Sequence, residues 1–137
     1  MFELILATAA LAASATETQK DPVIEQLSKD FYSLEIGEFR KPIPFRNRHE
    51  RSAERAVKKA NCDMYAEVGW VHARVDFAMQ VSSDGRITKI IPVDTGCRAL
   101  ENYVINHLQE YAGGNDVVLR PGSGKWYRQS MTFRWPE

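Results

Sequence analysis

Cys62 and Cys97 are the only cysteines of the chain, and their spacing decides which sulfur chemistry is open to them. They are far apart in the sequence and do not form a C-x-x-C motif, so a thiol redox site is disfavoured. Two sulfurs without a matching pair of histidines also make a poor zinc site. In an oxidising compartment such a pair forms one structural bridge, whereas in the cytosol it would be two buried thiols. We predict a Cys62–Cys97 disulfide if the chain is exported.

Three histidines, His49, His72 and His107, are the other candidates for metal binding or acid–base chemistry. None lies at metal-ligand spacing from another, and each is predicted to be a surface side chain. Nucleophilic catalysis needs a Ser or Cys near a His and a carboxylate. Cys97 and His107 are nearly three turns apart on one predicted helix, and His72 and Asp76 are about 13 Å apart along one predicted strand. We therefore predict no catalytic residue and no metal site.

A glycine-containing stretch before the last predicted strand, PGSGKW, is similar to a phosphate-binding loop. Leu119 stands where the first glycine of that motif should be, and Trp126 replaces the Ser or Thr that would hold magnesium. A glycine turn that leads into a strand explains the stretch better. No cofactor is expected.

Composition limits the possible partners. With 137 residues, of which 44% are hydrophobic, the chain is long enough for one domain with a real core and too short for two. Eighteen basic residues balance eighteen acidic ones. Nucleic acid or an anionic membrane would require a basic excess, so neither is expected to be the main partner.

The N-terminal segment has the features of a secretory signal. Leu4–Ala13 is apolar but shorter than the about 20 residues that span a bilayer, and Ala13-Ser14-Ala15 is a small-x-small cleavage pattern. We predict that residues 1–15 are a signal peptide, that the protein is periplasmic or secreted, and that no membrane span remains after cleavage. The alternatives are an ordinary apolar helix and a short uncleaved anchor.

Residues 16–46 are predicted to form an N-terminal helical extension. Asp21 and Pro22 suit the start of a helix on which Ile24, Leu27 and Phe31 share one side. A second helix is predicted to open the main domain, residues 47–137. Asn47 and Glu50 resemble a capping box, and the apolar stripe of this helix is Ala53, Ala56, Val57 and Ala60. A Cys62–Cys97 bridge would join its end to the start of the next helix.

The main domain is predicted to be α+β, in the order strand, strand, helix, strand, as an antiparallel sheet with the N-terminal helices packed on it. The odd positions from Val71 to Val81 are all apolar, which predicts a long half-buried strand. Asp84-Gly85 predicts a tight hairpin to a second strand, 87–93. The next apolar stripe has helical spacing, with Thr95 or Asp94 as the cap and Gly113-Gly114 as the stop: Cys97, Leu100, Val104, Leu108 and Tyr111.

The last strand is predicted over residues 125–135, with two faces of different character. Apolar side chains dominate one face: Tyr127, Met131, Phe133 and Trp135. The other face carries the polar residues and one tryptophan: Trp126, Arg128, Ser130, Thr132 and Arg134.

Several of these segments together resemble the C-terminal domain of the TonB energy-transducer family. They are ERA (Glu54–Ala56), the long strand with its turn (Gly69–Ile87), the helix start and helix (Thr95–Tyr111) and the closing MTFRW (Met131–Trp135). The likeness covers about residues 50–136. The chain departs from the family at Ser52-Ala53, where Tyr-Pro is common, and at Glu101, where Asp is usual. We also expect neither the long Pro-rich spacer nor the full membrane anchor of that family.

The resemblance implies a free-standing, transport-related periplasmic interaction module that binds a partner peptide as an added strand along its last strand. The partner would be a protein segment, such as one of an outer-membrane receptor, or a second copy in a homodimer. The candidate contacts are Trp126, Arg128, Ser130, Thr132 and Arg134. The alternative for these residues is an ordinary solvated strand face. The alternative function is a small secreted enzyme or ligand carrier with a pocket between helices and sheet.

Overall fold

The computed structural model describes residues 30–112, 116–121 and 125–137, and within them the chain is α+β as expected. A five-stranded sheet is formed by β1 (Glu35–Ile36), β2 (Ala66–Glu67), β3 (Trp70–Val81), β4 (Ile87–Pro92) and β5 (Trp126–Pro136). The helices are η1 (Phe31–Ser33), α3 (Asn47–Lys59) and α4 (Arg98–Tyr111). The predicted signal peptide, the helix expected after Asp21 and the Gly113-Gly114 stop lie outside the described residues.

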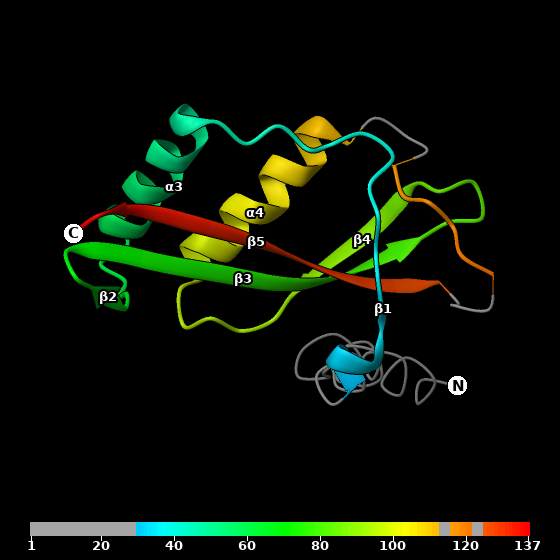
Figure 1. Cartoon of the computed structure of the whole chain (residues 1–137), viewed down its shortest axis with the longest axis horizontal. Coiled ribbons are helices and arrows are strands. Elements are labelled where there is room, and N and C mark those ends of the chain that lie inside the picture. The colour runs from blue at the N-terminus through cyan, green and yellow to red at the C-terminus, as the bar shows by residue number, and fades with distance from the viewer. Residues whose placement is uncertain (1–29, 113–115, 122–124) are drawn as a thin grey trace, which may run out of the picture.

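Strand β3 is the centre of the sheet (Figure 1). It pairs antiparallel with β5 over the full length of β5, from Trp70↔Pro136 to Gln80↔Trp126. On its other side it pairs with β4 and, near its start, with β2. The predicted hairpin between β3 and β4 is confirmed, and Gly85 supplies the positive φ of 85° that its turn requires.

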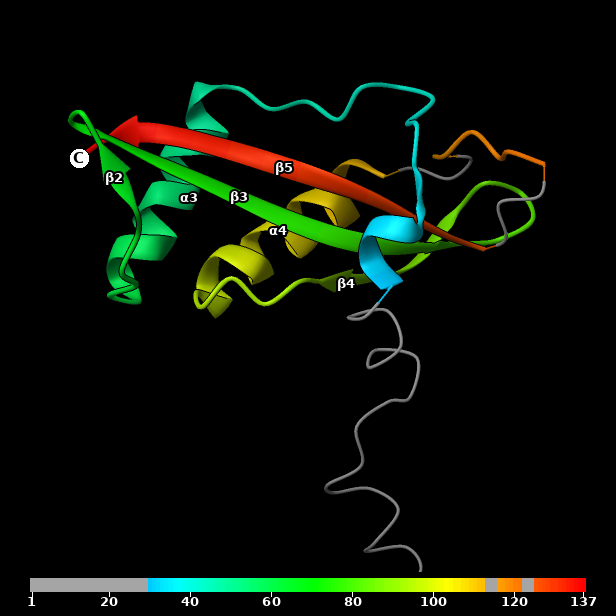
Figure 2. The same cartoon turned by 60° about the horizontal axis from the view of Figure 1, so that its bottom comes forward.

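Helices α3 and α4 both pack on one face of the sheet (Figure 2). The side chains of β3 that they cover are its odd-numbered ones, as the sequence alternation predicts, and Val75, Phe77 and Met79 are fully buried. From α4, Leu100, Val104 and Leu108 complete this core. Tyr127, Phe133 and Trp135 of β5 are also buried, so the predicted apolar face of the last strand is correct apart from half-buried Met131.

The helix starts differ from the predicted caps. The residue before α3 is Arg46, and its backbone N–H donates to Nδ1 of His49 at 2.9 Å, so the Asn47–Glu50 capping box was wrong. Glu50 is not available for it because its carboxylate accepts a hydrogen bond from the backbone N–H of Arg134. The residue before α4 is Cys97 and neither Thr95 nor Asp94.

The predicted apolar stripe of α3 is correct only in its middle. Ala53 and Val57 are buried, whereas Ala60 is exposed at the end of the helix. The predicted bridge between Cys62 and Cys97 is present, with 5.6 Å between the Cα atoms. It ties the chain just after α3 to the residue that precedes α4, so the end of α3 and the start of α4 are held together.

The opposite face of the sheet is covered in part by residues 31–34. Phe31 of η1 packs on Ala78, with Trp126 and Ile91 beside it. Of the described helices, none has the length and apolar character that a bilayer crossing requires.

Candidate functional site

The outer edge of β5 is where the sequence predicts a partner strand, and the register shows which backbone groups point outward. The carbonyl of Arg128 accepts from the N–H of Gly37, and the N–H of Arg134 donates to Glu50, so both residues point away from β3. Strand residues alternate in direction, so Ser130 and Thr132 also present their N–H and C=O groups to the outer edge.

The first part of this edge is already occupied by the same chain. Strand β1 pairs with it in parallel, Glu35 opposite Tyr127 and Ile36 opposite Arg128 (Figure 1). The side chain of Gln129 donates to the carbonyl of Gly37 at 2.7 Å. A Cβ at Gly37 would lie 2.7 Å from Cε of Met79 and 3.1 Å from Cβ of Tyr127, so a larger residue here would require these side chains to shift. The chain thus adds a strand to its own edge.

Two of the five predicted contact residues face residues 31–34, which precede β1. Trp126 is half-buried beside Phe31, and Nε of Arg128 donates to the carbonyl of Leu34 at 3.0 Å. The guanidinium of Arg128 also lies 5.8 Å from the ring centroid of Tyr32. These two side chains hold residues 31–34 against the sheet.

The other three predicted residues, Ser130, Thr132 and Arg134, mark the open stretch of the edge. The N–H of Ser130 is held by Oε1 of Gln129 at 3.0 Å and that of Arg134 by Oε2 of Glu50 at 2.9 Å. Among the described residues, the outward N–H and C=O of Thr132 have no hydrogen-bond partner. Side chains therefore cap both ends of this stretch, and its centre is open.

The sheet face beside this stretch is polar and carries the guanidinium groups of Arg74 and Arg134. Arg134 stacks on the ring of Trp70 at 4.1 Å, and Nε of Arg74 lies 2.8 Å from Oδ1 of Asp76. A depression of about 350 Å³ lies here. Its lining is formed by Glu50, His72, Ala73, Arg74, Thr132, Phe133 and Arg134.

The prediction that all three histidines lie on the surface was wrong for His49 and His107, which are 8% and 3% exposed. Nε2 of His107 donates to the carbonyl of Pro44 at 2.7 Å. His107 follows Leu100 by seven residues and Val104 by three, and this helical spacing placed it on the buried stripe. His72 is exposed, as predicted.

His49 is neutral in this arrangement. Its Nδ1 accepts from the N–H of Arg46, so the ring proton is on Nε2, which lies 3.1 Å from the hydroxyl of Tyr111. Burial lowers the pKa of His49 below the ordinary 6.5, and the charges of His107 and Arg48 lower it further. Arg46 acts in the same direction, and only Glu110 opposes them.

This histidine predicts a pH dependence of stability. The folded state disfavours protonated His49, so its contribution is fully present above the unfolded pKa of 6.5 and is lost as the pH falls through the lower folded pKa. Between about pH 7.5 and 5 we expect the wild-type chain to lose more unfolding free energy than His49→Gln. Urea titrations at both pH values measure this loss. His72→Gln is the control and should follow wild type; an equal loss in His49→Gln would contradict the assignment.

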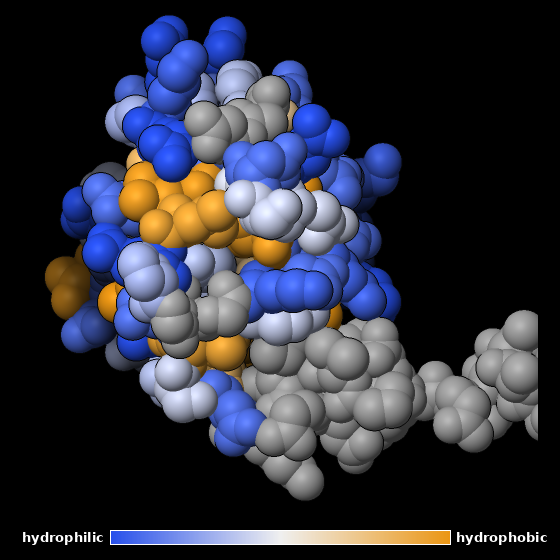
Figure 3. Space-filling model, turned by 90° about the vertical axis from the view of Figure 1, so that its right-hand side faces the viewer, coloured by the Kyte–Doolittle hydropathy of each residue, from blue (hydrophilic) through white to orange (hydrophobic). Residues whose placement is uncertain are grey.

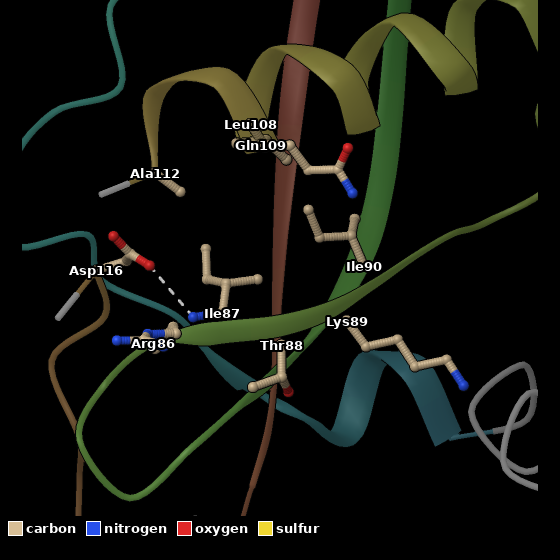
Figure 4. A pocket seen from close by; sticks show the side chains of 9 residues that line it. All are labelled: Arg86, Ile87, Thr88, Lys89, Ile90, Leu108, Gln109, Ala112 and Asp116. Atoms are coloured by element: carbon tan, nitrogen blue, oxygen red, sulfur yellow. Dashed lines mark hydrogen bonds between the residues drawn. The ribbon is translucent and has the colours of Figure 1, made fainter. Parts of the chain in front are cut away.

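A second surface, the groove between β4 and the end of α4, has an apolar floor (Figure 4). Its volume is about 370 Å³, and Ile87, Ile90 and Leu108 line it. The carboxylate of Asp116 at its rim accepts from the N–H of Ile87 at 3.2 Å, so it supports the strand. An apolar patch ringed by polar residues is visible from the end of the molecule shown in Figure 3. Charged side chains, Arg86, Lys89 and Asp116, also line the groove.

Comparison with known proteins adds no identity: no family model, no curated protein and no solved structure matches the chain. In the described part of the chain, no group of three or more His, Cys, Asp or Glu side chains could hold a metal ion.

Proposed function

We propose that this protein is an exported interaction module, similar to the TonB C-terminal domain, that binds an extended segment of a partner protein as an added strand. The binding stretch is the edge of β5 from Ser130 to Arg134. The observation that carries the proposal is the outward N–H and C=O of Thr132, which have no partner among the described residues in the middle of an ordered strand. Strand addition obtains its affinity from such main-chain groups.

The rest of the edge supports this reading. Strand β1 is already added to β5 at Tyr127 and Arg128, so this edge accepts an extended segment in parallel register. The caps on Ser130 and Arg134 are side-chain hydrogen bonds. An incoming strand can displace them and replace each with a backbone bond, whereas an uncapped edge would invite aggregation.

Export and a role in transport are part of the same proposal. The Cys62–Cys97 bridge supports an oxidising compartment such as the periplasm, because such bridges are rare in the cytosol. The motifs shared with the TonB family support a partner involved in transport, such as a segment of an outer-membrane receptor. A second copy of the chain is the other candidate partner.

Replacing Thr132 by proline tests strand addition directly. The N–H of Thr132 points away from β3, so Thr132→Pro leaves the ladder to β3 intact but removes the donor and places a ring at the edge. We expect Thr132→Pro to lose at least about tenfold in partner affinity. Thr132→Val, which keeps the N–H, is the matched control.

The measurement uses periplasmic extract and the full chain. The proposal is supported by a partner that binds wild type and Thr132→Val but not Thr132→Pro. This partner should also slow the hydrogen exchange of the Thr132 amide in the wild-type chain. Self-association would give the same protection, but only as protein concentration rises. Strand addition at this edge would be refuted by a partner that Thr132→Pro binds as well as wild type does and that leaves the exchange of the Thr132 amide in the wild-type chain unchanged.

A further inference from the structure

The charges around Thr132 define which side chain a partner strand can place there. Thr132 lies directly opposite Arg74 on β3, and Arg134 lies opposite His72. All four side chains are on the open face of the sheet and are exposed. The only carboxylate among their ladder neighbours is that of Asp76, which is paired with Arg74. Thr132 is therefore a small residue flanked by two guanidinium groups.

The geometry of an added strand brings one partner side chain to this position. A residue paired with Thr132 projects its side chain to the same face, with its Cβ about 5 Å from that of Thr132 and about 7 to 8 Å from the diagonal neighbour Arg134. A carboxylate at this position is within reach of the guanidinium of Arg134, and Arg74 is one strand further on.

The partner residues on either side of this position point to the other face. There they lie beside Met131 and Phe133, and Phe133 already packs against the ring of Phe45 at 5.2 Å between centroids. Met131 is half-buried. Apolar side chains fit these two flanking positions, because a charged group there would lose its hydration.

We propose that the partner segment carries an acidic residue opposite Thr132 with an apolar residue on each side of it. This inference rests on the proposed strand addition and states which extended segments the edge selects.

Glu50 supplies one of the two caps that a partner must displace, and it is the charged one. Its carboxylate holds the N–H of Arg134, which an incoming backbone carbonyl would take over, and it brings a negative charge to the rim of the same depression. Removing it frees the amide and strengthens the positive field at Thr132. Glu50→Ala is thus expected to bind an acidic segment more tightly than wild type.

Three synthetic peptides that differ at one position test the inference. They are Ac-Ser-Thr-Val-Glu-Val-Thr-Ser-NH2 and the same peptide with Gln or Lys in place of Glu. Each is titrated into the full-length protein, and the amide signals of Ser130, Thr132 and Arg134 are followed by NMR. We expect the Glu peptide to bind about two- to fivefold more tightly than the Gln peptide, and the Lys peptide to bind most weakly. Added salt should reduce the difference.

Protein variants locate the preference. Arg74→Gln and Arg134→Gln should each reduce the ratio of the affinities for the Glu and Gln peptides. Arg86 is an exposed arginine in the β3–β4 turn, and Arg86→Gln should leave this ratio unchanged. Equal binding of all three peptides, or a ratio unaffected by both arginine variants, would overturn the acidic preference and leave strand addition intact. If no peptide shifts the Ser130 and Thr132 amides at millimolar concentration, the proposed function itself fails.

Discussion

Replacing Phe77 by alanine is expected to lower the free energy of unfolding by about 3 to 5 kcal/mol, which is the largest effect that we predict for one side chain. Phe77 is 1% exposed in the middle of β3, where it packs in the core beneath the helices. The substitution removes most of a buried ring and leaves a cavity that neighbours on two rigid elements fill only in part. Leu100→Ala, on the helix side of the same core, is expected to cost about 2 to 5 kcal/mol.

Urea unfolding followed by circular dichroism measures both losses. His72→Ala is the matched control, because His72 lies on the same strand and points to the exposed face. It should change the unfolding free energy by no more than about 0.5 kcal/mol. If the midpoint of Phe77→Ala moves no further than that of His72→Ala, β3 does not bury its odd-numbered side chains, and both the fold and the edge of β5 would have to be reassigned.

Removing the Cys62–Cys97 bridge is expected to cost about 3 to 4 kcal/mol. The bridge closes a loop across a sequence separation of 35, so its main effect is to restrict the unfolded chain. The loop contains β2, β3 and β4, which means that most of the sheet lies between the two linked helix ends. The measurement compares the unfolding free energy of the wild-type chain with that of the Cys62→Ala, Cys97→Ala double variant.

Reductant provides the control for this prediction. It should destabilise the wild-type chain to a similar extent and leave the double variant unchanged. The dependence on denaturant should also become steeper on reduction, because the unfolded chain expands when the loop opens. Mass spectrometry that finds two free thiols in exported protein would remove the bridge from the account, as would a double variant as stable as wild type.

The edge of β5 is protected against uncontrolled pairing, and in the proposed function the same edge binds the partner segment. Edge strands are a risk for aggregation, and this one is shortened by β1 at one end and capped by Glu50 at the other. What remains open is centred on a single residue, Thr132, between two residues whose caps can be displaced. Such an edge favours an extended segment that can replace both caps, and it gives little advantage to a shorter or irregular one.

The sequence by itself determined the elements that carry a local repeat. The period-two alternation from Val71 to Val81 predicted β3 and the face that it buries, and the helical spacing of Leu100, Val104 and Leu108 predicted α4 and its contact with the sheet. Asp84-Gly85 predicted the hairpin turn, and the two cysteines predicted the bridge. The strand, the helix and the turn each depend on side chains within one segment. The bridge depends on cysteine, because two cysteines in an exported chain usually form a disulfide.

The tertiary structure alone decided how distant segments complete the edge. The pairing of Glu35 with Tyr127, the bond from Arg134 to Glu50 and the packing of His49 against His107 join residues more than fifty positions apart. The two-residue strand β1 is too short to show a periodicity in the sequence. The sequence also does not reveal whether the carboxylate of Glu50 caps its own helix or the distant amide of Arg134. These contacts form only after β3, β5 and the helices are packed, so their hydrogen bonds depend on the assembled fold and have no local signal.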